Sequence, residues 1–103
     1  MSAAYSPHVK FLRKWGFRGG GDGEFRWPQG LGIDFERNVY VSDRGNDRIQ
    51  VFDPQGIFLR KWGVSGSGDG EFSQPQDLAI DSDGDVYVSD QGNHRILVFK
   101  PTV

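Results

Sequence analysis

An all-β fold, built from two copies of one repeat, is predicted by three observations on this sequence of 103 residues. Glycine occupies 15 positions, about twice its usual share, which indicates many tight turns. Apolar residues alternate with polar ones in short runs rich in Val, Ile, Phe and Tyr, and no stretch has helical periodicity. The third observation is an internal duplication, which implies that two similar structural units follow one another along the chain.

The two copies are separated by an offset of 47 residues, which is plainest in FLRKWG at 11–16 and again at 58–63. Residues 11–56 align with 58–103 without a gap, and 29 of the 46 pairs are identical, whereas unrelated sequences would share about three. The same register reaches back to Tyr5. We therefore expect a disordered tail at 1–4, followed by two repeats over 5–103.

Each copy is expected to contain four short strands. The predicted strands, in chain order, are 9–16, 29–34, 38–43, 48–52, 57–63, 76–81, 85–90 and 95–99. Pro28 and Pro75 precede the runs QGLGID and QDLAID, and proline is tolerated where a strand begins. Turns rich in Asp, Asn and Gly separate the runs. Four antiparallel strands in a repeat of a little over roughly 40 residues are typical of a β-propeller blade.

Two loops, 16–28 and 63–75, are too rich in glycine to form helices. Each contains the sequence GDGEF, and we expect Phe25 and Phe72 at its end to tuck under a neighbouring blade. The segment 81–85 (DSDGD) is similar to half of a calcium-binding loop. A strand follows it at once, however, without the full loop and terminal Glu that calcium binding of this kind requires, so a hairpin turn is favoured.

The strand count leaves both ends of the chain incomplete. Residues 29–63 form a complete blade, 76–100 supply three strands of a second, and 9–16 is an outer strand without a blade. Alone, these two edges would expose apolar side chains and would recruit other chains. The residues concerned are Phe11, Leu12, Trp15, Ile96 and Val98. We expect the strand at 9–16 of one copy to complete the second blade of the next, in a closed ring of two, three or four chains.

The string P-Q-x-L-x-I-D-x-x-x-x-V-Y-V-S-D-x-G-N-x-R-I-x-V-F-x-P occurs at 28–54 and at 75–101, and it resembles the NHL repeat. This resemblance implies β-propeller blades, most often six to a ring, and therefore favours a homotrimer of two-blade chains. It also implies a binding platform for protein or RNA, as in the NHL domains of tripartite-motif proteins and of the fly protein Brat. Because two repeats cannot close a ring alone, the sequence also fits a fragment, natural or engineered.

The composition narrows the functions that the chain can have. The 12 Lys and Arg against 14 Asp and Glu give a net charge of −2, so the chain is not a broadly basic one and DNA is not an expected partner. The absence of Cys excludes disulfides and thiolate chemistry. His8 and His94 lie in turn-like segments with no triad-like Ser nearby, so we expect no catalysis, no cofactor and no metal. No run in this sequence is long and apolar enough for a membrane span or a signal peptide, and the location is left open.

One group of polar residues follows the second strand of each copy. Its members are Asp43, Asn46 and Arg48, with Asp90, Asn93 and Arg95 as their counterparts. In a turn, the Asp would accept backbone N–H groups of the Gly-Asn segment and pair with the Arg. Because the pattern is present in both copies, a structural turn is favoured over a polar binding site repeated around the ring.

A second group lies in loops on one face of the expected propeller, at positions where the two copies differ. Its members are Arg18, Arg26, Trp27, Arg44, Asp47, Gln91 and His94. Where the fold does not fix the residue type, the two copies can differ, as expected of a surface that binds a partner. Aromatic side chains on such a surface would allow RNA bases to stack. The pairs Arg13-Lys14 and Arg60-Lys61 are better explained as charges that protect an outer edge.

Two functions follow. The first is structural: a scaffold whose activity is self-assembly of two-blade chains into a symmetric closed ring. The alternative is a platform that binds a protein or RNA partner through the loop face.

Overall fold

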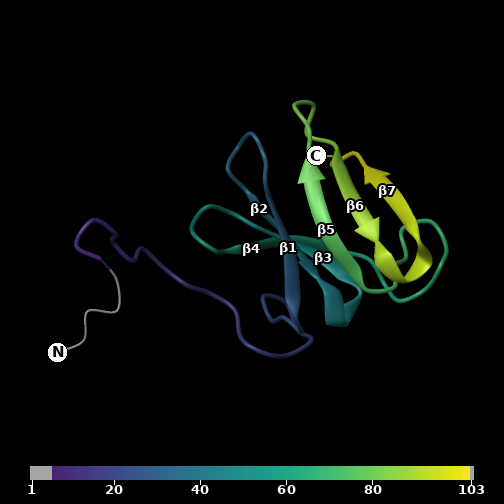
Figure 1. The fold of residues 1–103 in the computed structure, drawn as a ribbon, viewed down its shortest axis with the longest axis horizontal. Helices are drawn as coiled ribbons and strands as arrows, with labels where there is room; N and C mark the ends of the chain where they lie inside the picture. The colour runs from purple at the N-terminus through teal and green to yellow at the C-terminus, as the bar shows by residue number, and fades with distance from the viewer. Residues whose placement is uncertain (1–5, 103) are drawn as a thin grey trace.

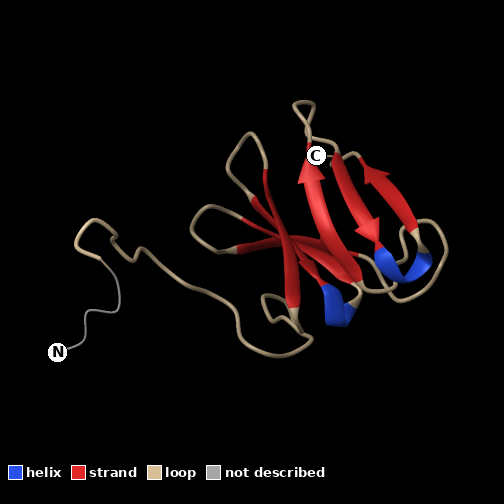
Figure 2. Cartoon of the chain, viewed as in Figure 1, coloured by secondary structure: helices blue, strands red, loops and turns tan. Residues whose placement is uncertain are grey.

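The computed structural model describes residues 6–102, and their fold is all-β, as predicted (Figures 1 and 2). The expected tail at 1–4 lies outside the described residues. The strands are β1 (Pro28–Ile33), β2 (Val39–Asp43), β3 (Arg48–Phe52), β4 (Phe58–Trp62), β5 (Pro75–Ile80), β6 (Val86–Asp90) and β7 (Arg95–Phe99). Two single turns of 3-10 helix, η1 (Arg44–Asn46) and η2 (Gln91–Asn93), connect β2 to β3 and β6 to β7.

The strands form two antiparallel sheets, which we call blade 1 and blade 2. Blade 1 has the order β1-β2-β3-β4, and blade 2 has the order β5-β6-β7. Equivalent strands pair in the same register: Val39 lies opposite Phe52 in blade 1, and Val86 lies opposite Phe99 in blade 2. Blade 1 therefore has the outer strand that blade 2 lacks.

The two sheets cover residues 28–62 and 75–99, close to the 29–63 and 76–100 that the sequence pattern indicates. The first strand of each blade begins at its proline. Pro28 lies opposite Asp43 in blade 1, and Pro75 lies opposite Asp90 in blade 2. An isolated bridge then precedes each sheet, between Arg18 and Phe25 in one copy and between Ser65 and Phe72 in the other.

The segment 9–16, expected as an outer strand, makes no β ladder within the described part of the chain. Figure 1 shows it running away from blade 1 on the side opposite blade 2, so it lies far from the free edge of β7. The molecule is correspondingly elongated, with extents of 51 × 29 × 22 Å. An outer strand pairs with the free edge of the third strand of a blade, and no such free edge lies next to this segment among the described residues.

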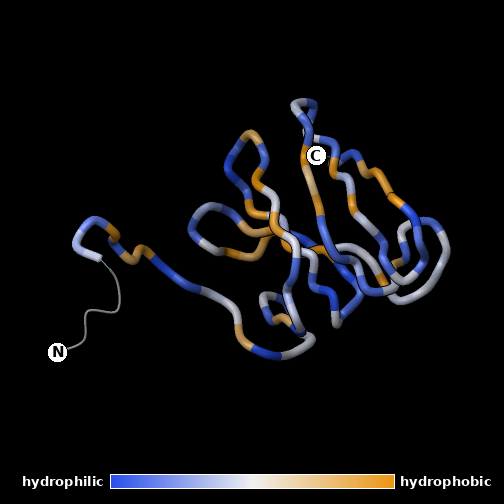
Figure 3. Tube along the Cα trace, viewed as in Figure 1, coloured by the Kyte–Doolittle hydropathy of each residue, from blue (hydrophilic) through white to orange (hydrophobic). Residues whose placement is uncertain are grey.

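The main apolar core lies between the two blades. Blade 1 contributes Tyr40, Ile49 and Val51 to it, and blade 2 contributes Val86 and Val88. Phe72 is fully buried in this core, as the sequence pattern indicated, and its ring packs 5.7 Å from that of Phe99. Figure 3 shows apolar stretches along the strands of both blades, and others in the N-terminal segment that has no blade to cover it.

A second, smaller cluster covers the other face of blade 1. It contains Val39, Val41 and Phe52, with Phe25 and Phe58 packed against them. Phe25 therefore tucks against its own blade, because no other blade lies on that side within the described residues. Among the described residues, both faces of blade 1 are covered, whereas blade 2 is covered only on the face toward blade 1.

Candidate functional site

The turn after β2 is organised by the buried carboxylate of Asp43. One of its oxygens accepts the backbone N–H of Arg26 at 2.7 Å, and the other accepts the Arg48 Nε–H at 2.7 Å and the Asn46 amide at 2.9 Å. The side chains of both Asp43 and Arg48 are buried. The predicted backbone donors in the Gly-Asn segment were wrong: the donor comes from the loop before β1, because the carboxylate points to that loop and not along its own turn.

Arg48 extends this arrangement into the glycine-rich loop. Its guanidinium donates to the carbonyl oxygens of Gly20, Gly21 and Glu24 at 2.8–3.0 Å. A buried ion pair is stable only where further hydrogen bonds satisfy its remaining donors and acceptors. Asp43 and Arg48 meet that requirement, so they hold the 19–26 loop in place as structural groups.

Blade 2 repeats the arrangement around Asp90. The carboxylate accepts the Ser73 N–H at 2.7 Å, and the Asn93 amide and the Arg95 Nε–H at 2.9 Å each. Burial by itself raises the pKa of Asp90, but the hydrogen bonds from Asn93, Ser73 and Arg95 outweigh burial and hold this pKa below its ordinary value. The Arg95 side chain is 28% exposed, against 7% for Arg48, because no further blade covers it.

The hairpin turn at 81–85 has the geometry that the sequence favours. Asp81 accepts the backbone N–H groups of Asp83 and Asp85 at 2.9 and 3.0 Å, and the Tyr87 hydroxyl at 3.1 Å. The backbone hydrogen bond from Asp85 is the largest of the effects that lower the pKa of Asp81. Within residues 6–102, no group of three His, Asp or Glu side chains is placed to hold a metal ion.

The predicted loop face is divided between two places in the structure. Arg44 and Asp47 are half-buried at the joint between the blades, where both contact Gln74 of the loop before β5. The Gln74 N–H donates to the Asp47 carboxylate at 2.8 Å, and Arg44 donates to the Gln74 side chain at 3.5 Å. Their counterparts Gln91 and His94 are exposed, because no loop of a following blade reaches them.

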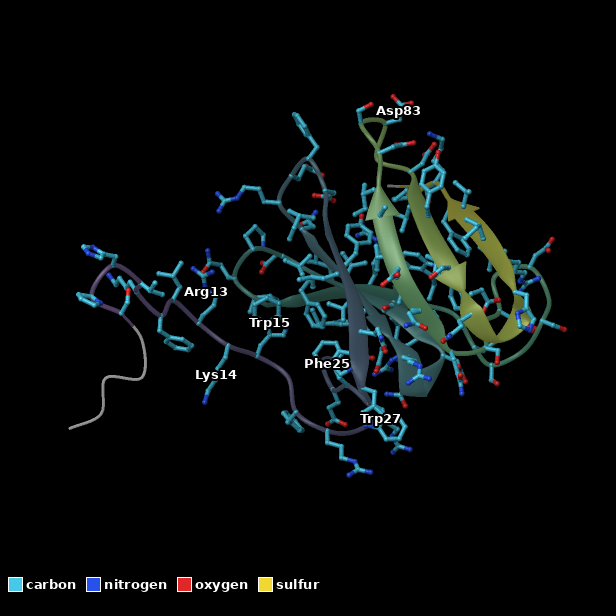
Figure 4. All side chains as sticks on the ribbon, viewed as in Figure 1. Arg13, Lys14, Trp15, Phe25, Trp27 and Asp83 are labelled. Carbon is cyan, nitrogen blue, oxygen red and sulfur yellow. The ribbon has the colours of Figure 1, made fainter. Side chains whose placement is uncertain are left out.

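Arg18, Arg26 and Trp27 line an open groove of about 380 Å³, and the Arg26 carbonyl oxygen accepts the N–H of Gly45, the residue after Arg44, at 2.7 Å. The groove is also lined by Trp15 and Phe25, and Figure 4 shows these two side chains beside blade 1. Trp27 is 68% exposed. Trp27 and Arg44 also line a second open hollow together. The structure therefore divides the seven candidate residues between two places: Arg18, Arg26, Trp27, Arg44 and Asp47 lie on blade 1, and Gln91 and His94 lie on the exposed end of blade 2.

All five residues of the predicted assembly edges are exposed. The exposed fractions are 56% for Phe11, 67% for Leu12, 36% for Trp15, 62% for Ile96 and 54% for Val98. Sequence reasoning missed further exposed apolar residues, among them Tyr87 on β6 and Leu31 on β1. The signal was available, because Tyr87 lies on the same face as Ile96 and Val98, and Leu31 is the copy of Leu78, which is buried between the blades.

The exposed face of blade 2 is the copy of a face that is buried in blade 1. Tyr40, Ile49 and Val51 on blade 1 are the counterparts of Tyr87, Ile96 and Val98 on blade 2, and all three are covered by blade 2. The Ser42 hydroxyl on the same face donates across the joint to the carbonyl oxygen of Gln76 at 2.6 Å. Within residues 6–102, nothing covers the corresponding face of blade 2.

None of the helices within residues 6–102 is long and apolar enough to cross a membrane.

Comparison with known proteins identifies the repeat. The NHL repeat model matches residues 25–52 and 72–99, more than half of the chain. Among curated relatives, the protein lin-41 of Caenorhabditis elegans is 43% identical over 54 residues, which cover 52% of this chain and 4% of lin-41. The E3 ubiquitin-protein ligase TRIM32 of Mus musculus is 46% identical over 46 residues, 45% of this chain and 7% of TRIM32. The E3 ubiquitin-protein ligase TRIM71 of Rattus norvegicus is 46% identical over 41 residues, 40% of this chain and 5% of TRIM71.

The matched part of the chain thus spans less than a tenth of the length of these relatives. Both family matches include the carboxylate that organises each turn and the first three strands of each blade. The chain belongs to the NHL-repeat family.

Proposed function

We propose that this chain is a self-assembling propeller module, in which two-blade chains close into one ring. The observation that carries the proposal is the unequal burial of equivalent residues. Ile49 and Val51 are fully buried, whereas their copies Ile96 and Val98 are 62% and 54% exposed. Fully burying one such side chain contributes about 1.5–3 kcal/mol, so covering this face stabilises any arrangement that does so.

The root of the N-terminal segment supports the same proposal. Trp15 packs on Phe52 with ring centroids 5.7 Å apart, as Trp62, at the end of the outer strand β4, packs on Phe99 at 5.4 Å. The next residue, Gly16, lies against the ring of Phe25, just as Gly63 lies against that of Phe72. The chain therefore enters blade 1 as it enters blade 2, and the segment before Trp15 leaves in the direction of an outer strand that belongs to a preceding blade.

Ring closure requires this preceding blade to come from another copy, because the segment and blade 2 lie on opposite sides of blade 1 (Figure 1). Head-to-tail contacts of this kind close into rings where the rotation per chain allows it. The six-bladed habit of NHL propellers favours three chains. Dimers and tetramers, with four and eight blades, also lie within the range of about 4 to 8 blades that propellers show.

Light scattering coupled to size exclusion tests the proposal. We expect the mass of three chains for the full sequence, and loss of this mass when residues 1–16 are removed. The variant Val98→Lys should also fail to assemble, since Val98 is exposed in the single chain and its change leaves the blade intact. Glu36→Lys, a charge change twice as large but placed in an exposed turn, is the control that keeps the trimer. A compact monomer for the full sequence overturns the proposal.

A second candidate function is a platform that binds protein or RNA. It is favoured by the groove beside Trp27, where Arg18 and Arg26 lie next to exposed aromatic side chains. Aromatic and Arg side chains together suit the stacking of unpaired RNA bases. The test is binding of the triple variant Arg26→Ala, Trp27→Ala, Arg44→Ala to RNA and protein ligands of the unchanged chain. Binding that is lost while the oligomeric mass is kept supports a platform, and unchanged binding excludes this face.

A further inference from the structure

We propose that the joint between chains copies the joint within a chain, with residues 11–15 of one copy paired to β7 of another in a fixed antiparallel register. In this register Trp15 lies opposite Ile96, Lys14 opposite Leu97, Arg13 opposite Val98 and Phe11 opposite Phe99. The inference rests on the proposed self-assembly and adds to it the residue of the neighbouring copy with which each residue of the segment pairs. The occupant of the exposed edge is therefore a second copy of this chain.

The register comes from the pairing of β3 with β4 inside blade 1. There Ile49 lies opposite Trp62, Gln50 opposite Lys61, Val51 opposite Arg60 and Phe52 opposite Phe58. Subtracting 47 from the residues of β4 and adding 47 to those of β3 gives the proposed pairs. FLRKW is identical at 11–15 and 58–62, so the strand that would be added has the sequence of the strand already in place.

The register also has a distinguishing irregularity. The β3–β4 ladder shifts between Val51 and Phe52, so that Leu59 has no partner. The incoming strand should shift at the same place and leave Leu12 without a partner. A one-residue slip elsewhere would move every side chain to the opposite face and expose Trp15, so the register is strongly specified.

The faces of the two blades complement one another at this joint. The exposed Tyr87, Ile96 and Val98 of one copy would meet the side of blade 1 that holds Phe25 and Leu31 of the next. These are the copies of residues that already meet within a chain, where Phe72 and Leu78 pack against Tyr40, Ile49 and Val51.

The loops at the joint between chains differ from those within a chain. Within a chain, Gln74 contacts Arg44 and Asp47. The copies of these three residues are Trp27, Gln91 and His94, all exposed. The geometry therefore places Trp27 of the next copy over Gln91 and His94 of the copy before it. The loop residues that differ between the two repeats would thus distinguish the joint between chains from the joint within a chain.

The inner strands must be further apart at the joint between chains. A Cβ atom added at Gly30 would lie 2.8 Å from the Cα of Asp77 and nearer still to the carbonyl oxygen of Gln76. The copy of Gly30 is Asp77, which does have a Cβ atom and would face the backbone at Gln29 and Gly30 of the next copy. Backbone atoms cannot move aside as the end of a flexible side chain can. We therefore expect the distance between β5 of one copy and β1 of the next to be larger than the distance between β1 and β5 within a chain.

Cysteine cross-linking of the full chain tests the register. The sequence contains no cysteine, so every disulfide of the Arg13→Cys, Val98→Cys variant joins engineered residues, and peptide mapping identifies the 13–98 link. Both residues are exposed in the single chain, and opposed residues of antiparallel strands are about 4.5–5.5 Å apart at Cα, within the range that a disulfide spans. The control pair is Lys14→Cys with Val98→Cys, whose Cβ atoms would lie on opposite faces of the sheet.

On mild oxidation, we expect the Arg13→Cys, Val98→Cys pair to give covalent multimers that end at the size of the ring, and the control pair to give at least about tenfold fewer. Equal or greater cross-linking of the control overturns the register. If light scattering shows the ring but neither pair cross-links, the register is wrong while self-assembly stands. If light scattering of the chain without cysteines shows a monomer, both proposals fail.

Discussion

Blades 1 and 2 contain the same five-residue strand, Val-Tyr-Val-Ser-Asp, in two different environments. Tyr40 in blade 1 is 1% exposed, and its copy Tyr87 in blade 2 is 41% exposed. The same contrast separates Ile49 from Ile96, at 0% and 62%. Identical sequence and identical strand pairing thus coexist with unlike burial, because burial of a blade face depends on the neighbouring blade. Part of the apolar surface of a blade is therefore buried only when a neighbouring blade lies against it.

The contrast extends to the buried turns. Asp43 accepts from the Gln50 amide as well as from Arg48 and Asn46, whereas the position of Gln50 is taken by Leu97 in blade 2. Arg48 is buried and Arg95 is partly exposed. The same ion pair is therefore more deeply desolvated, and more fully hydrogen-bonded, in blade 1.

The largest effect is expected from breaking these two ion pairs separately. Asp43→Ala leaves a buried guanidinium without its partner, and such a change costs about 3–5 kcal/mol. Asp90→Ala should cost less, because water reaches the Arg95 side chain. Urea unfolding of the two variants, followed by circular dichroism, measures the difference. Equal losses would show that the neighbouring blade contributes nothing to the strength of the pair.

The next largest effect separates folding from assembly. Ile49→Ala creates a cavity between the blades and should reduce the free energy of unfolding of a single chain by about 2–5 kcal/mol. Ile96→Ala should change the unfolding of a dilute, dissociated chain very little, but should raise the concentration at which the ring forms. The checks are urea unfolding at low concentration and light scattering across a dilution series. A chain-level loss for Ile96→Ala similar to that for Ile49→Ala would contradict the comparison.

These differences mark how far the sequence could predict the structure. The duplication, the alternating strands and the prolines at their starts locate the sheets closely, because these signals are local. The residues adjacent to Tyr40 and Tyr87 could not distinguish their burial, since both lie in the sequence VYVS, and only the missing neighbour of blade 2 separates them. Nor could the sequence show that Arg44 and Asp47 meet Gln74, because that contact depends on how one blade is placed against the next.

The donor to Asp43 shows the same limit on a smaller scale. The Asp, Asn and Arg were recognisable as one turn from their spacing, and the structure brings them together. The backbone N–H of Arg26, however, is 17 residues away from Asp43 along the chain. A sequence pattern identifies groups that a turn needs, but only the path of the preceding loop decides which backbone group completes it.

A smaller effect is expected from exchanging the residues at the inner strands. Gly30→Ala forces the β1 and β5 backbones apart and should destabilise the joint within the chain by about 1–3 kcal/mol. Asp77→Gly should do the opposite at the joint between chains, by letting the inner strands approach, and should slow dissociation of the ring. Thermal unfolding measures the first variant, and the rate of subunit exchange measures the second. Unchanged exchange for Asp77→Gly would mean that the inner strands do not limit the joint.

The smallest effect concerns pH and is confined to blade 2. Hydrogen bonds hold the pKa of Asp90 in the folded chain below the ordinary value of about 3.9 for an unfolded Asp. The ionised carboxylate therefore stabilises the fold above that value, and the contribution is lost as the pH falls from there through the lower pKa of the folded chain. The urea midpoint should decline over this acidic range, and the decline should be shallower in Asp90→Asn, whose amide does not titrate. If Asp90→Asn has as steep a decline as the unchanged chain, other carboxylates such as Asp81 dominate the acid response, and the turn of blade 2 does not limit stability at low pH.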